Sequence, residues 1–227
     1  MPAARAVCTT EAALRHPTRP FTPVLCVLSD RNHLNRASIG PVDPSRAPSG
    51  GFDGAVAIYA LGDLEPQVHP TAFIHPDAVV IGSVVIGAES TVWPGAVLRG
   101  DHGSIRIGSQ TSIQDGTVIH CTATLDTVVG DRCVIGHRVH LEGCTVHDDC
   151  LVGSGSIVLH NVVVGRGSLI GAAALVPNNT VIPPRSRALG VPARITEGVV
   201  PEGEFERFVE TYVHNAHRYA AELRRLD

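Results

Sequence analysis

The feature that most restricts the fold of this 227-residue chain is an aliphatic residue at almost every sixth position. The pattern begins at Val68 and continues to Ile182, with a slip at Gly100–Ser104, an insertion at Cys121–Asp126 and a one-residue deletion before Val146. A six-residue repeat of this persistence is typical of a β-solenoid, in which each unit forms one short strand and a corner. Three units complete a triangular coil, and each coil buries its aliphatic side chains against the coils above and below.

A sandwich of ordinary strands is the alternative all-β fold, but it requires period-two alternation with frequent turn signals, which this sequence lacks. The composition agrees with stacked aliphatics, because aromatic residues make up only 4% of the chain, which has 23 glycines. Hexads such as Val152–Ser156 resemble those of the left-handed parallel β-helix. We therefore expect an all-β, left-handed parallel β-helix, with the handedness resting on that resemblance because parallel crossovers are ordinarily right-handed.

Three segments are expected along the chain. Residues 1–55 are rich in Pro and Arg and have no hydrophobic period, so they are expected to be a disordered leader or a wrongly assigned start. Residues 56–195 are expected to form the β-helix. Residues 196–227 are expected to form a C-terminal helix packed along it.

The C-terminal helix is expected to open at Pro201-Glu202, because apolar residues then recur at spacings of three and four. Those residues are Phe205, Phe208, Val209, Tyr212, Ala216, Tyr219, Ala220 and Leu223. Acidic residues near the start, with Arg224 and Arg225 at the end, suit the helix dipole.

Charge and cysteine usage exclude several classes of protein. The formal net charge of −4 gives no reason to expect nucleic acid or an anionic membrane as a partner. All 18 basic residues are Arg, so catalysis by lysine is excluded. The six cysteines form no CxxC pair, which is typical of the reduced thiols of a cytoplasmic protein.

Polar residues at equivalent positions of adjacent coils predict a site. His120 and Glu142 each follow the inward residue of the third face, so their side chains should both point outward, about 4.8 Å apart. Arg99 should lie one coil below them. His137 follows the second face, around a corner, and would reach His120 only from a neighbouring copy. This separation predicts a homotrimer with sites at its interfaces.

Five motifs in this region resemble those of the gamma-class carbonic anhydrases. They are Arg99-Gly100-Asp101, Ile113-Gln114-Asp115-Gly116, Val118-Ile119-His120, Ile135-Gly136-His137 and Leu141-Glu142-Gly143-Cys144. The resemblance runs from about Ala57 to Leu223. It implies left-handed β-helix trimers that hold Zn²⁺, with Fe²⁺ or Co²⁺ possible, through three histidines, one of them from the adjacent subunit.

The resemblance assigns His120 as the first metal ligand and His137 as the second. The matching positions of the interface and active-site network are Arg99, Asp101, Gln114 and Asp115. The third ligand position departs from the family, which has a histidine where this chain has Glu142. Glu142 could bind the metal itself, since two histidines and one carboxylate form a known zinc set. His140 could replace it, or the site could bind no metal.

A bound divalent cation lowers the pKa of its water to about 7, so a metal-bound hydroxide would be available to hydrate CO₂ to bicarbonate. Gln114 is expected to orient the nucleophile, and Arg99 to stabilise the anionic product or hold Asp101. A carboxylate ligand adds negative charge, so hydration should be slower at neutral pH than with three histidines. His160, in the next coil, is a candidate to line the pocket, whereas His102 is expected to be solvated.

Two other functions are compatible with hexads. A hexapeptide-repeat acyltransferase would use a histidine as general base and bind an acyl donor between subunits. Two observations are evidence against an acyltransferase. The sequence has no lysine to bind the phosphates of coenzyme A, and no long loop leaves the predicted β-helix. The third possibility is a non-catalytic trimeric scaffold or small-ligand binder of the same fold.

Overall fold

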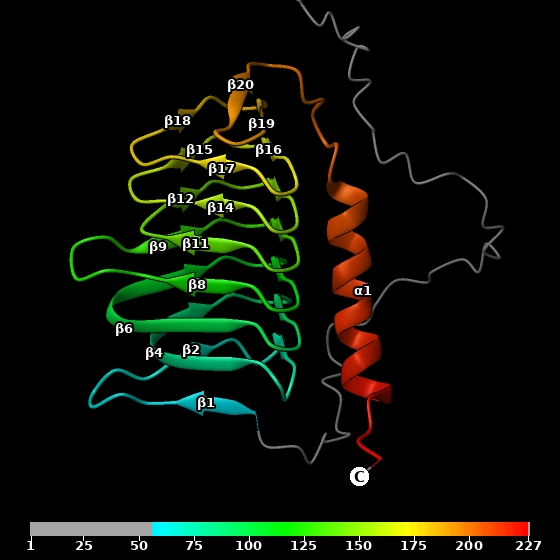
Figure 1. Cartoon of the computed structure of the whole chain (residues 1–227). Helices are drawn as coiled ribbons and strands as arrows, with labels where there is room; N and C mark the ends of the chain where they lie inside the picture. Colours follow the sequence, from blue (N-terminus) through cyan, green and yellow to red (C-terminus); the bar gives the residue numbers. More distant parts are fainter. Residues whose placement is uncertain (1–55, 227) are drawn as a thin grey trace, which may run out of the picture. The chain divides into compact units, whose positions relative to one another are not determined.

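The computed structural model describes residues 56–226. The expectation for the leader, residues 1–55, therefore lies outside the described residues. The described part is a left-handed parallel β-helix followed by one helix, as the hexads predicted (Figure 1). Within it, no helix is long and apolar enough to cross a membrane.

Strand β1 (Ala57–Tyr59) opens the β-helix, and the remaining strands fall on three faces. The first face holds β2 (Gln67–Val68), β9 (Thr127–Val129), β12 (Thr145–Val146), β15 (Val163–Val164) and β18 (Val181–Ile182). The second holds β3 (Phe73–Ile74), β5 (Thr91–Val92), β7 (Ser112–Ile113), β10 (Val134–Ile135), β13 (Leu151–Val152), β16 (Leu169–Ile170), β19 (Arg187–Leu189) and β20 (Arg194–Thr196). The third holds β8 (Val118–His120), β11 (His140–Glu142), β14 (Ile157–Val158) and β17 (Leu175–Val176). The longer strands β4 (Val79–Ile86) and β6 (Val97–Ile107) cover parts of the third and first faces.

Successive coils pair in parallel, and among the named strands only β19 and β20 pair antiparallel. The structure confirms the residue pairs expected from the period, which are Ile107–Val129, Ile113–Ile135 and Ile119–Leu141. All six side chains lie in one buried core. The register therefore survives both the slip in β6 and the insertion after β8.

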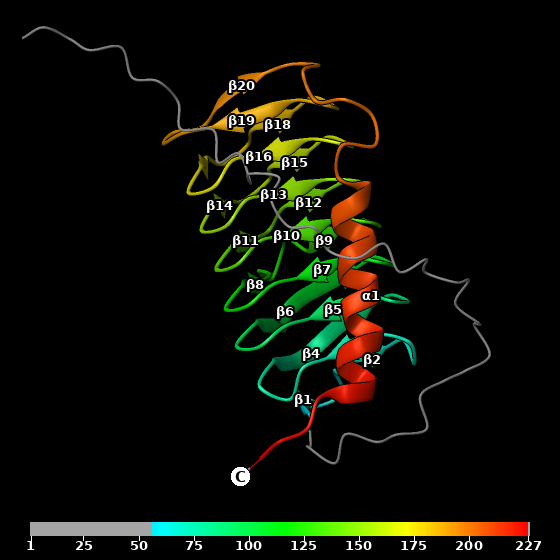
Figure 2. The same ribbon diagram turned by 90° about the vertical axis from the view of Figure 1, so that its right-hand side faces the viewer.

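Helix α1 (Glu206–Glu222) lies against the second face of the β-helix (Figure 2). Trp93 anchors it, since its ring centroid lies 4.9 Å from that of Tyr219 and 6.1 Å from that of Tyr212. The Trp93 indole N–H also donates to the hydroxyl of Ser112 at 3.0 Å. The apolar face of the helix thus packs against the β-helix, as the spacing of three and four predicted.

Three details of the helix differ from the expectation. It begins at Glu206, because residues 202–205 form turns before it. Of the acidic residues expected at its start only Glu206 lies in the first turn, and Arg224 and Arg225 follow the last turn. Phe208, placed by spacing on the buried face, is 43% exposed, because it lies about 100° around the helix from Val209, which with Ala216 forms the buried stripe.

Replacing Trp93 by Ala should destabilise the fold by about 3–5 kcal/mol, because it removes a buried aromatic side chain together with the anchor of α1. Urea unfolding followed by circular dichroism measures this change. Phe208→Ala is the matched control and should cost far less, since Phe208 is exposed. Equal midpoints for Trp93→Ala and the unmodified protein would contradict the anchoring role.

Candidate metal and catalytic site

The candidate site is a column of polar side chains on the third face. Arg99 of β6 pairs with His120 of β8, and His120 pairs with Glu142 of β11. This is the stacking that the period predicted. Because parallel coils repeat at the strand spacing of about 4.8 Å, the column brings a guanidinium, an imidazole and a carboxylate within reach of one another.

The His120 imidazole lies between two carboxylates. Its Nε2 is 2.9 Å from Oδ1 of Asp101, and its Nδ1 is 3.0 Å from Oε1 of Glu142. A neutral imidazole has one N–H and can donate to only one of them. Both ring nitrogens of His120 have a favourable partner only if both carry a proton or if one of them binds a cation. His120 is only 18% exposed, so the surrounding protein holds this geometry.

Glu142 lies among three imidazoles. Besides the bond to His120, its Oε2 is 3.2 Å from Nε2 of His140, and its Oε1 is 3.7 Å from Nε2 of His160. Burial raises the pKa of Glu142, but the hydrogen bonds from His120 and His140 outweigh it, and the pKa lies below its ordinary value. The Nε2 atom of His160 is buried and makes no hydrogen bond. His160 therefore lines this site, as its place in the repeat suggested.

Asp101 is the second carboxylate of the cluster. Burial raises its pKa, but hydrogen bonds from His102, His120 and Arg99 lower it to well below its ordinary value. The Arg99 guanidinium binds Oδ2, whereas His120 and His102 lie at Oδ1. Asp101 is consequently a carboxylate at any pH near neutrality.

The remaining predicted site residues form a separate group. His137 places its Nδ1 2.8 Å from Oδ2 of Asp115, and its side chain is 53% exposed. Gln114 is buried and hydrogen-bonded to Tyr212 of α1. Burial raises the pKa of Tyr212, the charge of Asp115 adds to this, and the bond to Gln114 opposes it. Within one chain, no described contact joins His137, Gln114 or Asp115 to His120.

Sequence reasoning missed two participants. His102 is solvated as expected, with 63% of its side chain exposed, but its Nδ1 also lies 3.1 Å from Oδ1 of Asp101 in the bulge of β6. Tyr212 was recognised only as part of the apolar helix face. The alternating pattern of β6 could have suggested that the His102 side chain points outward. Which neighbour it points toward, however, depends on the bulge.

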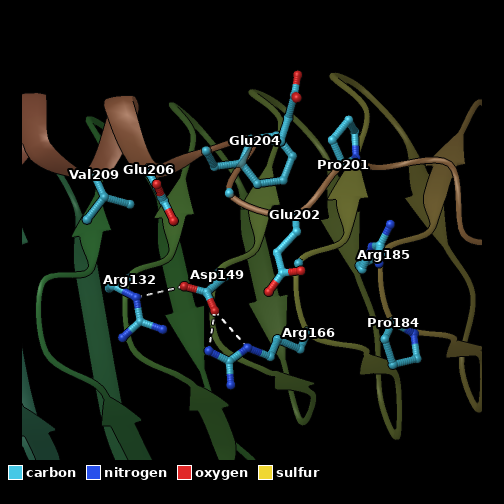
Figure 3. A pocket seen from close by; sticks show the side chains of 13 residues that line it. Arg132, Asp149, Arg166, Pro184, Arg185, Pro201, Glu202, Glu204, Glu206 and Val209 are labelled. Carbon is cyan, nitrogen blue, oxygen red and sulfur yellow. Dashed lines mark hydrogen bonds and ion pairs between the residues drawn. The ribbon is translucent and has the colours of Figure 1, made fainter.

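A pocket of about 590 Å³ lies elsewhere, between the start of α1 and another corner of the β-helix (Figure 3). Figure 3 shows Arg132 and Arg166 bound to the same carboxylate, that of Asp149. Glu202 and Glu206 line the opposite side. None of the residues clustered around His120 lines this pocket. The pocket and the candidate metal site therefore lie at different places on the β-helix.

The fold and its repeated hexads define a hexapeptide β-helix protein. The family model described as "Bacterial transferase hexapeptide (six repeats)" matches residues 65–100 and 143–178. The carnitine operon protein CaiE of Escherichia coli is 40% identical over 144 residues, which are 63% of this chain and 74% of CaiE. The mitochondrial gamma carbonic anhydrase 2 of Arabidopsis thaliana is 38% identical over 168 residues, 70% of this chain and 60% of that protein.

A solved structure from Bacillus cereus, named as that of a candidate acetyltransferase, superimposes with a TM-score of 0.71 at 32% identity. The match covers 73% of this chain and 98% of that one. The chain belongs to the hexapeptide-repeat family, in which CaiE and a gamma carbonic anhydrase are among its relatives. The hexapeptide-repeat membership expected from the hexads is confirmed.

The lowered pKa of Asp101 makes a prediction about stability and pH. A lowered pKa means that the unfolded chain binds more protons in acid, so this contribution is present above the unfolded pKa, about 3.9, and is lost as the pH falls through the lower folded pKa. Asp101→Asn should therefore flatten the acid limb of a plot of unfolding free energy against pH, measured by urea titration. The same substitution at the exposed Asp63 is the control. An unchanged acid limb in Asp101→Asn would contradict the assignment.

Proposed function

We propose that this chain is a metal-dependent enzyme of the gamma carbonic anhydrase type, which hydrates carbon dioxide to bicarbonate at sites between subunits of a homotrimer. The observation that carries the proposal is the His120 imidazole, which lies between the carboxylates of Asp101 and Glu142 in the stacked column. The relative of Arabidopsis named as a gamma carbonic anhydrase supports the same function.

The donor set of the column fits a divalent cation. His120 and His140 offer imidazole nitrogens and Glu142 offers carboxylate oxygens, which are ligands that Zn²⁺, Fe²⁺ and Co²⁺ accept. The buried Nε2 of His160, without a hydrogen-bond partner, faces the same carboxylate. We propose Glu142 or His140 as the third ligand in place of the family's histidine.

In the proposed site, His137 would serve a neighbouring copy. Its Nδ1 is held by Asp115, so its Nε2 is the nitrogen left for a cation, and a carboxylate behind a ligand histidine fixes the ring and raises its basicity. The side chain is half exposed, at the corner between the second and third faces. A neighbour's His137 beside this chain's His120 completes the proposed ligand set, and a homotrimer makes three such sites.

A bound cation would supply a water acidic enough to act as a nucleophile near neutral pH. The residues of the chain would do the rest. Arg99 offers a positive charge beside Asp101, where an anionic product would be held. Gln114, buried and hydrogen-bonded to Tyr212, would present its amide at a fixed position to orient the nucleophile. As a ligand, Glu142 would add negative charge and make that water less acidic.

An acyltransferase is the second candidate, favoured by the likeness to the Bacillus cereus structure named as a candidate acetyltransferase. It would require an acyl donor held between subunits, with His120 or His140 as general base. The chain has no lysine to bind the phosphates of coenzyme A. Thermal stabilisation by acetyl-CoA, without any response to zinc, would favour this function over the proposed one.

The activity itself is tested by stopped-flow CO₂ hydration with protein loaded with zinc, cobalt or, without oxygen, iron. His120→Ala should lose at least a hundredfold in rate, whereas Glu142→His should raise the rate at neutral pH, because it restores a neutral third ligand. His217→Ala on the exposed face of α1 is the control and should change nothing. Metal-loaded protein without activity at any pH would exclude the proposal.

Sharing of the site between copies makes a separate prediction. His120→Ala and His137→Ala should each be inactive as pure trimers. Random mixing by reversible denaturation should restore about a quarter of the unmodified activity, because one site in four then combines an intact His120 with a neighbour's intact His137. No recovery after mixing, with trimers shown by light scattering, would exclude a shared site.

A further inference from the structure

Strand β6 leaves the six-residue repeat at one point and displays His102. Gly82 pairs with Gly100 and Val84 with Ile105, so the single residue Ser83 lies opposite the four residues Asp101–Ser104. The extra residues bulge from the third face beside His120. The slip seen in the hexad pattern is therefore a structural excursion next to the candidate site.

The excursion is fixed in place by the insertion that follows β8. The backbone N–H of Ser104 donates to Oδ1 of Asp126 at 2.7 Å. A Cβ on Gly103 would lie 2.5 Å from the carbonyl oxygen of Thr122, so only glycine allows this close approach. Because Gly103 and Ser104 are both held closely against the insertion, Asp101 and His102 have a defined position relative to His120.

Three ligand-type side chains converge there. Oδ1 of Asp101 is 2.9 Å from Nε2 of His120 and 3.1 Å from Nδ1 of His102. One ligating atom of each residue lies within 4.8 Å of those of the other two. Donors around a tetrahedral zinc ion lie about 3.3 Å apart, given bonds of about 2.0–2.1 Å, so small movements would suffice to bind a cation.

The charges around the three residues favour a cation. Arg99 occupies Oδ2 of Asp101, which orients the carboxylate and leaves Oδ1 for one ligand bond. Asp101 and Glu142 bring two negative charges against the one positive charge of Arg99, so the neighbourhood is negative overall while the imidazoles are neutral. His102 is 63% exposed, so water can reach the open side of a bound cation.

Glu142 completes this arrangement from the other side of the His120 ring. With Nε2 bound to a cation, His120 would carry its proton on Nδ1 and donate it to Oε1 of Glu142, 3.0 Å away. A ligand histidine typically donates its other N–H to such a carboxylate, which fixes the tautomer and raises the basicity of the ligand. In this arrangement Glu142 orients a ligand and does not bind the cation.

We propose that Asp101, His102 and His120 form a divalent-cation site, with two histidines and one carboxylate, that is complete within a single chain. It uses Nε2 of His120, which faces Asp101, whereas an intersubunit site with Glu142 as a ligand would use Nδ1, which lies 3.0 Å from Oε1 of Glu142. One neutral imidazole cannot serve both, so the two sites compete for the same residue. The single-chain site takes zinc, cobalt or ferrous iron without His137 of a neighbouring copy.

The test is a Co²⁺ titration of the full-length protein after removal of metals with a chelator, followed by visible absorption and by metal content after dialysis. His102→Ala should weaken cobalt binding at least tenfold, whereas His137→Ala should bind one cobalt per chain as the unmodified protein does. Glu142→Gln should weaken binding less than His102→Ala, since its amide oxygen still accepts the Nδ1–H. His217→Ala is the matched control for loss of an exposed imidazole.

Three results would overturn the single-chain site: no cobalt binding by the unmodified protein, unchanged binding in His102→Ala, or loss of binding in His137→Ala. The last two leave the intersubunit site and the proposed function standing. Gly103→Ala offers an independent check, because it should displace the excursion and weaken binding while His102 remains. CO₂ hydration by metal-loaded protein decides the proposed function separately, whichever nitrogen of His120 holds the cation.

Discussion

The structure depends on the in-register stacking of short parallel strands from one coil to the next. Each inward aliphatic residue packs on its equivalent, as Ile119 packs on Leu141, and backbone hydrogen bonds run between coils in the same register. A shift by one residue would turn the buried row outward and the polar row inward. The repeat therefore specifies the core and, at the same time, the position of every outward side chain.

The same register brings charged groups close enough to form hydrogen bonds and ion pairs. Outward residues of adjacent coils lie one strand spacing apart, so Arg99, His120 and Glu142 must face one another. Partial burial makes their hydrogen bonds strong and leaves an unpaired nitrogen costly. Two carboxylates accordingly flank the His120 imidazole, whereas the buried Nε2 of His160 makes no hydrogen bond and lies 3.7 Å from Oε1 of Glu142.

The departures from the six-residue repeat account for structural features that the regular coils do not have. The bulge of β6 exposes His102, and the insertion after β8 fixes that bulge through the hydrogen bond from Ser104 to Asp126. In-register coils already stack side chains such as His120 and Glu142 on one face, and the bulge of β6 adds His102 beside them.

The sequence by itself determined the β-helix, the pairing of coils and the column containing His120, because a strict period allows only one way of burying the aliphatic residues. It also separated His137 from that column, since the two follow different faces. Only the tertiary structure decided the direction of His102, the grouping of Gln114 with Tyr212 and the start of α1 at Glu206. Those features depend on backbone bends and on packing between segments distant in sequence, for which a local repeat contains no information.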